Sequence, residues 1–537
     1  MTISLRKGKY EVIIIALFTI YVGLFFRFHN LEGKVYWLDE SFTSLSVSAY
    51  SREDVKQHLI TGQEIDFSVI KNYQYPHQET DYKGTIRGLI EDEPQHTPLY
   101  FLSARFWLQI FGHSIFTIRA FSVITGVFCL PLMYLLCMEL FEQPSIAWLA
   151  TTLMAVSPFH VLYSQEARPF SLWTLTTLLS CIALLKAQKE PSTKSWLFYS
   201  FSTILSLYTF LFSLLTCLAH FIYILTSEKF CFNKITIAFI MANLLAILGF
   251  SPWLKIIIKE PPSNYTSFPA SSLIAYPKAW IRNLTLPFID FNINSDSHLI
   301  SLLLFSIYLL ALLYFLTKSF NYLIARSRKK ALLFLASLLI IPCSILIIHD
   351  FGKGGQMTMR ANYLIPSLLS IQITFANLLG NKIRSQKGIW LSVTAAFLSL
   401  SIASCSMMTN SNIWWNKNSE NIHHQLAEII NQSELPLIIS DVLTDDEYIK
   451  PFSISHYLNE KAKFMFFFEP TENEGWQKID LPNRYSEIFL YAPSESLKTY
   501  LVENYGYSLI PLFEQSDLYC DCPDRVFYKL ASNKANS

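Results

Sequence analysis

Long runs of apolar residues recur along this chain and constrain its fold more than any other feature. A hydrocarbon core about 30 Å thick requires about 20 mostly apolar residues in each helix that crosses it. Only 15% of the 537 residues are charged, whereas soluble domains carry about 25%. The sequence therefore predicts an α-helical polytopic membrane protein with about eleven transmembrane helices, near residues 11–28, 115–141, 146–163, 169–186, 196–209, 211–227, 235–257, 298–317, 331–349, 361–379 and 389–408.

The distribution of basic residues predicts which side of the membrane each segment occupies. With the N-terminus inside, the inner segments collect most of the Lys and Arg, and the short outer loops contain chiefly Arg168, Lys353 and Arg360. This is the positive-inside asymmetry. The apolar run 196–227 is too long for one ordinary helix, and reading it as one would place residues 326–330 outside. We therefore predict two short helices that turn near residues 208–210, with the N-terminus inside and the C-terminus outside.

The first apolar run follows Arg6, Lys7 and Lys9, as in a signal peptide. It lacks a small-residue cleavage site, and further membrane segments follow it. We expect this run to remain in the protein as its first helix.

The predicted spans leave a long first outer loop and a polar C-terminal segment. The loop, about residues 29–114, has helical apolar spacing at 40–50 and 98–111, which predicts amphipathic helices on the membrane surface. After residue 409, apolar strands alternate with helices, which predicts a small α/β soluble domain. The expected domains are therefore a transmembrane domain at 1–408 and an extracytoplasmic domain at 409–537, with strands near 435–440, 462–468, 487–491, 508–512 and 525–530 and helices near 422–431 and 494–505.

Two adjacent carboxylates, Asp39 and Glu40, follow directly after the first apolar run and the polar residues 27–30. Ionisable groups near membrane depth are costly to desolvate and therefore mark candidate functional sites. The alternative is a pair of ordinary solvated loop acids past the end of a helix.

Further polar clusters lie at the outer ends of other predicted spans. Glu93 and His96 precede Pro98, which begins an apolar helix, and Arg119 lies inside an apolar span. A buried arginine needs an anionic or carbonyl partner, so a carboxylate, a backbone carbonyl and a lipid phosphate all remain open for Arg119.

Glu166 and Arg168 lie between two spans, where they form either a functional pair or a cap on a helical hairpin. Lys353 and Arg360 flank a Gly-rich loop at the start of another span. This loop is either an anion cradle backed by backbone amides or a flexible turn with basic interface anchors.

Carboxylates and cations thus gather at one predicted membrane boundary. This combination suits a reaction in which an acid deprotonates an acceptor while cations hold a leaving phosphate. A lipid-phosphate sugar donor meets that need, because its phosphate lies at headgroup level. The sequence offers no convincing set of metal ligands, so we expect no cofactor, although a divalent metal is not excluded. The net charge of +1 does not favour a nucleic-acid partner.

The motifs and their order resemble the polyprenyl-phosphate-sugar-dependent glycosyltransferases of the GT-C superfamily, especially glycosyltransferase family 39 and the bacterial aminoarabinose transferases. The resemblance covers about the first 200 residues and one later motif. It rests on Asp39-Glu40 after the first helix, His96-Thr-Pro-Leu-Tyr, Phe-Gly-His followed by Arg119, Tyr-Ser-Gln-Glu-Ala-Arg168 and Arg360-Ala-Asn-Tyr-Leu-Ile-Pro.

The resemblance implies a probable inverting transfer from a polyprenyl-phosphate donor, with Asp39 as the catalytic base or its positioner and Glu40 beside it. It places His96 near the donor phosphate. Thr97 replaces the first proline of the family's His-Pro-Pro-like segment, and an insertion near residues 53–87 lengthens the first loop. Metal use varies within these families.

Two other functions remain open. A transporter of lipid-linked glycans would line a path through the bilayer midplane with charged residues. In this sequence the residues near the middle of the predicted spans are mainly apolar, which counts against a transporter. A polysaccharide ligase or polymerase would use a similar lipid-linked donor with its base elsewhere. Few cysteines in the outer loops fit a bacterial inner membrane.

Overall fold

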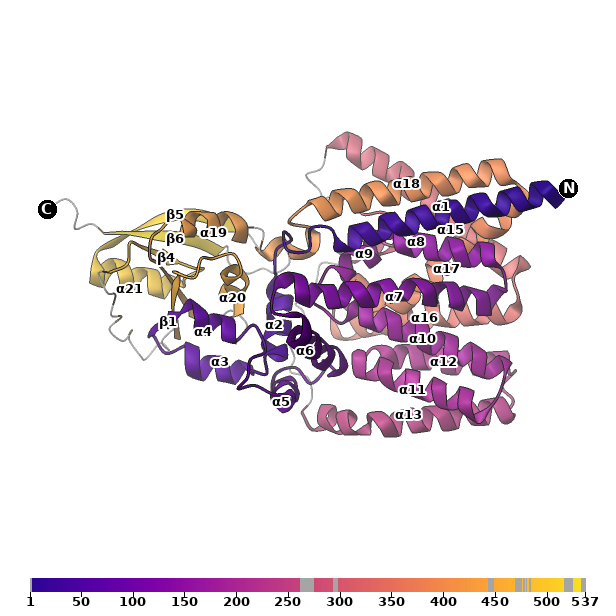
Figure 1. Cartoon of the computed structure of the whole chain (residues 1–537), viewed down its shortest axis with the longest axis horizontal. Coiled ribbons are helices and arrows are strands. Elements are labelled where there is room, and N and C mark those ends of the chain that lie inside the picture. The colour runs from indigo at the N-terminus through magenta and orange to yellow at the C-terminus, as the bar shows by residue number, and fades with distance from the viewer. Residues whose placement is uncertain are drawn as a thin grey trace. The chain divides into compact units, whose positions relative to one another are not determined.

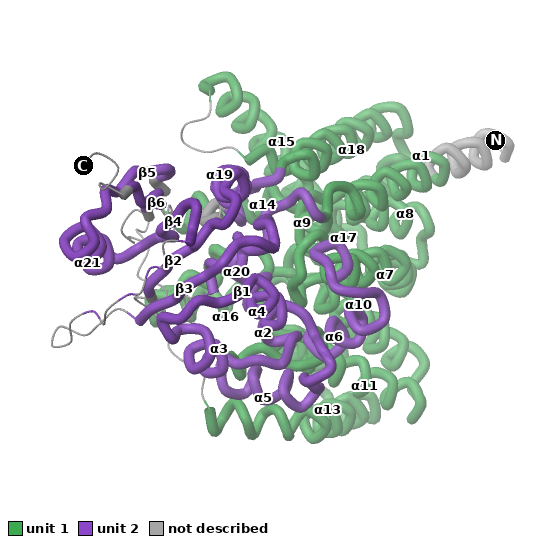
Figure 2. The backbone as a smooth tube through the Cα atoms, turned by 60° about the vertical axis from the view of Figure 1, so that its left-hand side comes forward, with its two compact units in different colours: residues 1–31, 93–100, 118–411 green, residues 32–92, 101–117, 412–537 purple. Residues whose placement is uncertain are grey.

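The computed structural model describes residues 2–260, 275–292, 298–420, 422–442, 449–468, 476, 479, 481, 484–515 and 525–532. Contacts between residues divide the chain into two compact units, coloured separately in Figure 2. Unit 1 comprises Met1–Leu31, Glu93–Tyr100 and Ile118–Ser411, and unit 2 comprises Glu32–Asp92, Phe101–Thr117 and Asn412–Ser537. Both units therefore combine segments that are far apart in the sequence.

Unit 1 is built from long apolar helices (Figure 1). They are α1 (Thr2–Phe28), most of α7 (Ile115–Phe141), α8 (Pro144–Ala155), α9 (Pro158–Ser164), α10 (Phe170–Lys189), α11 (Thr193–Thr209), α12 (Ser213–Ser227), α13 (Lys234–Lys259), α14 (Ala275–Thr285), α15 (Leu299–Arg326), α16 (Lys329–Lys353), α17 (Ile365–Ser385) and α18 (Lys387–Asn410), with short 3-10 turns η2 (Met357–Met359) and η3 (Ala361–Leu364).

Helix α17 forms the centre of unit 1, where it packs against α8, α15, α16 and α18. It is almost entirely buried, and its polar side chains bond to neighbouring helices rather than to water. Ser370 Oγ donates to the Leu335 carbonyl at 2.7 Å, and Gln372 Nε2 donates to the Pro287 carbonyl at 3.0 Å. Buried polar groups in a membrane protein require such partners.

Each predicted span lies on a helix or a helix pair. Among the described residues, seven helices are long and apolar enough to cross a membrane, and the bent pair α8–α9, with an angle of 55°, gives an eighth candidate. The predicted break in the run 196–227 is confirmed, because α11 ends at Thr209 and α12 begins at Ser213. The chain is a multi-pass membrane protein, while the total of eleven spans stays a prediction.

Unit 2 contains shorter helices and one sheet (Figure 1). Its elements are α2 (Leu38–Val47), α3 (Arg52–Leu59), β1 (Glu64–Asp66), α4 (Phe67–Asn72), α5 (Tyr82–Asp92), most of α6 (Leu99–Phe111), the 3-10 turn η4 (Trp415–Glu420), α19 (His423–Asn431), β2 (Pro436–Val442), α20 (Lys450–Ser455), β3 (Lys463–Phe468), β4 (Glu487–Leu490), α21 (Glu495–Tyr505), β5 (Tyr507–Gln515) and β6 (Arg525–Ser532).

The sheet of unit 2 has the strand order β1-β3-β2-β4-β6-β5. Strand β2 pairs in parallel with β3 and with β4, while β1, β6 and β5 join as antiparallel strands. Alternate residues of β2 face opposite sides, as the period of two requires. Ile438 therefore belongs to one apolar cluster, and Leu437 and Ile439 belong to the other.

Strand β1 comes from the first outer loop and forms the edge of a sheet otherwise made by the C-terminal segment. Two ion pairs support this edge, Asp66 with Lys463 and Glu64 with Arg484. The predicted division between residues 408 and 409 stays a prediction. The shared sheet shows that this loop and the C-terminal segment fold together in unit 2.

Helix α6 is amphipathic in an unusual way, because its arginine is buried and its apolar side chains are exposed. The Arg105 guanidinium donates to the Val47 carbonyl at 2.8 Å and to Thr80, and burial lowers the pKa of Arg105. Phe106, Ile110 and Phe111 are all more than half exposed. Both predicted loop helices are present as α2 and α6, and their location on the membrane surface stays a prediction.

Candidate functional site

The acid pair lies at the start of α2 in unit 2, and its two members have different environments. Glu40 is fully buried, and its Oε2 lies 3.0 Å from Lys417 Nζ, which is also buried. Lys417 Nζ also donates to the Val35 carbonyl at 2.9 Å. Glu40 is thus one half of a buried ion pair that joins the first loop to the C-terminal segment.

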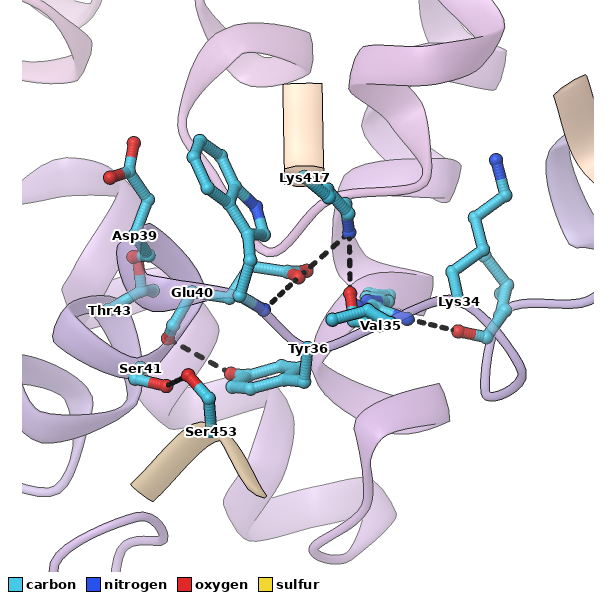
Figure 3. Close-up of polar contacts among 12 residues, drawn as sticks. Lys34, Val35, Tyr36, Asp39, Glu40, Ser41, Thr43, Lys417 and Ser453 are labelled. Atoms are coloured by element: carbon cyan, nitrogen blue, oxygen red, sulfur yellow. Dashed lines mark hydrogen bonds and ion pairs between the residues drawn. The ribbon is translucent and has the colours of Figure 1, made fainter. Parts of the chain in front are cut away.

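Asp39 is partly exposed, and its side chain points away from the Glu40–Lys417 pair (Figure 3). Its backbone carbonyl accepts a hydrogen bond from Thr43 Oγ1 at 3.1 Å, as expected within a helix. Neighbouring contacts fix the start of this helix, since Tyr36 Oη donates to the Glu40 carbonyl at 3.0 Å and the Ser41 and Ser453 hydroxyls lie 2.9 Å apart. The carboxylate of Asp39 is therefore presented by a firmly held helix start.

The other predicted site residues belong to unit 1. Arg119 is fully buried, and its Nη1 donates to the Leu31 carbonyl. A backbone carbonyl was one of the three partners that the sequence left open for it. The contact fixes the point where the chain leaves α1.

Arg27, at the end of the first predicted span, is fully buried and donates to the Met154 carbonyl at 3.0 Å and to the Ala155 carbonyl. These carbonyls belong to the last two residues of α8, directly before the break to α9. In return, Gln165 Nε2 donates to the Phe26 and His29 carbonyls at 2.7 and 2.8 Å. Arg27 and Gln165 thus fasten α1 to the broken span.

Glu166 and Arg168 follow directly on α9 and are both buried, at 1% and 6% exposure. The Arg168 guanidinium lies 5.8 Å from the centre of the Phe170 ring, a cation–π distance. Both alternatives for this pair, a functional pair and a cap on the helical hairpin, stay predictions.

Arg282, on α14, lies next to the residue that precedes Arg360. Its Nη2 donates to the Met359 carbonyl at 3.4 Å, and Met359 directly precedes Arg360. The structure therefore brings Arg282 and Arg360 to one turn, although they are 78 residues apart in the sequence. Arg282, on α14, was missed by the sequence analysis.

Glu93 and His96 form a second, smaller polar pair of unit 1. His96 Nε2 lies 3.6 Å from Glu93 Oε2, and both side chains are less than one-fifth exposed. Between them, the Pro94 carbonyl accepts a hydrogen bond from Trp253 Nε1 of α13 at 3.0 Å. This segment therefore packs into the helices as a fixed element.

The Gly-rich loop after α16 differs from the anion cradle that was one of the two predicted possibilities. Its Met357 and Thr358 amides donate to the buried Asp350 carboxylate at 2.8 and 2.7 Å. These amides already bind an anion of the protein itself. Lys353 is exposed in the last turn of α16, and Arg360 is exposed after the loop.

An apolar groove lies beside this loop, between α14, α16 and α17. Its volume is about 160 Å³, and its lining includes Trp280, Leu284, Ile347, Leu364 and Leu368. Thr358 and Asn283 contribute polar atoms to its lining. Among the described residues there is no group of three or more His, Cys, Asp or Glu side chains that could hold a metal ion.

The comparisons with known proteins agree with this architecture. Residues 95–256 match the family model described as dolichyl-phosphate-mannose-protein mannosyltransferase. The structure is similar to ArnT from Cupriavidus metallidurans bound to undecaprenyl phosphate, with a TM-score of 0.53 at 10% identity over 98% of this chain and 99% of ArnT. The apo state of that ArnT gives a TM-score of 0.54 at 11% identity, over 97% of both chains.

The chain has a GT-C fold. The resemblance that the motifs predicted is therefore confirmed, and it extends over nearly the full length of both chains. A search of curated proteins finds no sequence match. The family model covers the segment from Gln95, just before His96, to residue 256 in α13, which includes Arg119, Glu166 and Arg168.

Proposed function

We propose that the chain is a membrane glycosyltransferase that moves a sugar from a polyprenyl-phosphate donor to a lipid, glycan or protein acceptor on the extracytoplasmic face. The observation that carries this proposal is a pair of arginines at one turn beside an apolar groove. Arg282 Nη2 donates to the Met359 carbonyl at 3.4 Å, directly before Arg360, and Thr358 of the same turn lines the groove. A GT-C fold similar to that of an ArnT bound to undecaprenyl phosphate supports it.

The arginines suit the phosphate of such a donor. A guanidinium presents a planar fork of donors that matches phosphate oxygens, and charge-assisted bonds of this kind are stronger than neutral ones. The groove between α14, α16 and α17 offers an apolar surface for the first isoprene units, because its lining is mostly apolar, and Asn283 and Thr358 of that lining adjoin Arg282 and the turn before Arg360.

The reaction would be a single displacement with inversion at the anomeric carbon. The acceptor oxygen or nitrogen forms a bond to that carbon, the bond from carbon to the phosphate oxygen breaks, and the electron pair leaves with the lipid phosphate. Asp39 takes the acceptor's proton as general base, a role that the family resemblance supports. Glu40 positions Asp39 through its ion pair with Lys417. Glu93, His96, Arg119, Glu166, Arg168 and Lys353 are further candidates for substrate contacts.

The proposal includes a location. Eleven spans, a cytosolic N-terminus and an extracytoplasmic α/β domain at residues 409–537 would place Asp39 on the outer side of a bacterial inner membrane. The positive-inside distribution of Lys and Arg supports this orientation.

A donor panel tests the function. We expect purified chain to consume polyprenyl-monophosphate sugars and to leave diphosphate-linked sugars unchanged. Arg282→Ala and Arg360→Ala should each raise the KM for the donor about tenfold or more, because each removes a charge-assisted contact worth about 1.5–3 kcal/mol. Arg326→Ala is the matched control, because Arg326 is an exposed arginine at the C-terminal end of α15. Consumption of diphosphate donors alone, or unchanged KM values in both variants, would contradict the proposal.

A further inference from the structure

The turn that leads from α16 to Arg360 is built around one buried carboxylate, Asp350. This residue is 1% exposed. Its Oδ1 accepts the Met357 amide at 2.8 Å, and its Oδ2 accepts the Thr358 amide at 2.7 Å and the Thr358 hydroxyl at 2.6 Å. All three bonds hold the same turn, η2, which ends directly before Arg360.

Two glycines of this loop have separate structural reasons. Gly354 ends α16 with φ +70°, a left-handed conformation that favours glycine. At Gly355, a Cβ atom would lie 2.9 Å from Asp350 Oδ1 and 3.1 Å from His349 Nδ1. A side chain at this position would collide with the carboxylate. The Gly-rich sequence therefore allows the chain to fold back over Asp350.

Helix α14 holds the same turn from the other side. Trp280 Nε1 donates to Thr358 Oγ1 at 3.0 Å, and Asn283 Nδ2 donates to the Thr358 carbonyl at 2.9 Å and to the Met359 carbonyl at 3.2 Å. The Thr358 hydroxyl thus accepts from α14 and donates to Asp350. Arg282 lies on α14, between Trp280 and Asn283. The Arg282 guanidinium itself donates to the Met359 carbonyl at 3.4 Å, directly before Arg360, so both arginines are attached to one hydrogen-bonded turn.

We propose that Asp350 and Thr358 are positioning residues that fix Arg360 relative to Arg282 for binding a lipid phosphate. This inference rests on the proposed function of the two arginines. Neither Asp350 nor Thr358 needs to touch the phosphate, since both act through the turn. A charge-assisted acceptor with three bonds to one turn is suited to this task, because a displaced backbone would move Arg360 with it.

Undecaprenyl phosphate binding to the purified full chain in nanodiscs provides the test. Asp350→Asn replaces one acceptor oxygen with a donor, and Thr358→Val removes the hydroxyl while preserving shape. Each should weaken binding about tenfold or more. Thr358→Ser keeps the hydroxyl and should bind as the unmodified chain does. Ser337→Ala, which removes a hydroxyl bonded within α16, is the control.

Amide hydrogen exchange provides a readout that needs no ligand. In Asp350→Asn and Thr358→Val, residues 356–360 should exchange faster while α16 and α17 keep their protection. Weakened binding without faster exchange in the turn would overturn the positioning role. Normal binding by Asp350→Asn and Thr358→Val, together with loss of binding in Arg360→Ala, would also overturn the positioning role. If Arg360→Ala and the unmodified chain bind equally, the proposed phosphate site itself is wrong, and the two failures are thus distinguished.

Discussion

Asp39→Asn is expected to lower sugar transfer by about 100-fold to 10,000-fold, the range that a positioned general base contributes. An amide cannot accept the acceptor's proton at neutral pH. The neighbouring acid cannot replace it, because Glu40 is fully buried in its ion pair with Lys417. Asparagine preserves the size of the side chain, so the helix start should remain intact and the amount of folded protein should be unchanged.

The measurement is the initial rate of transfer at saturating donor, together with the thermal unfolding temperature. Glu91→Gln, an exposed acid of the same loop, is the matched control and should retain full activity. A rate for Asp39→Asn within a few-fold of the unmodified chain would exclude Asp39 as the base.

Lys417→Met is expected to be the most destabilising substitution in unit 2. It leaves the Glu40 carboxylate buried without its cation, and removing one partner of a buried pair costs about 3–5 kcal/mol. Urea titration of the purified chain, followed by tryptophan fluorescence, measures this loss. Lys463→Met breaks a partly exposed pair with Asp66 and should cost less than about 1 kcal/mol.

The double variant Glu40→Gln, Lys417→Met tests whether the loss of stability comes from the unpaired charge of Glu40. Because both charges are removed together, the double variant should be more stable than Lys417→Met alone. Equal stability of Lys417→Met and Lys463→Met would show that the buried pair contributes nothing beyond a surface contact.

The membrane helices were predictable because their signal is local. An apolar run of about 20 residues has few alternatives to a helix in a bilayer, and the charge asymmetry decided where the run 196–227 divides. Strand β1 was not predictable in the same way. It has three residues, and its partner β3 begins 397 residues after Asp66. No local sequence pattern predicts such a pairing.

The site could be predicted in part for a related reason. Asp39, Glu166 and Arg360 were found because polar residues at the ends of apolar runs are unusual. Lys417 and Arg282 lie in ordinary polar segments, and only their spatial partners give them importance. The sequence indicated that the Gly-rich loop could bind an anion. It could not show whether that anion is an external ligand or a carboxylate of the protein itself, such as Asp350. The burial of Arg27 could not be predicted from sequence, because its carbonyl partners belong to a helix end more than 120 residues away.

The release of polyprenyl phosphate from a polyprenyl-phosphate sugar tests the central claim most directly. Purified chain in proteoliposomes would be given undecaprenyl-phosphate pentoses, hexoses and amino sugars with an envelope lipid and glycan extract as acceptor, and free undecaprenyl phosphate would be measured by mass spectrometry. We predict acceptor-dependent release by the unmodified chain and almost none by Asp39→Asn or by the Arg282→Ala, Arg360→Ala double variant. Equal release by all three proteins would contradict the account. Turnover of a diphosphate-linked sugar, with no release from any monophosphate sugar, would also contradict it.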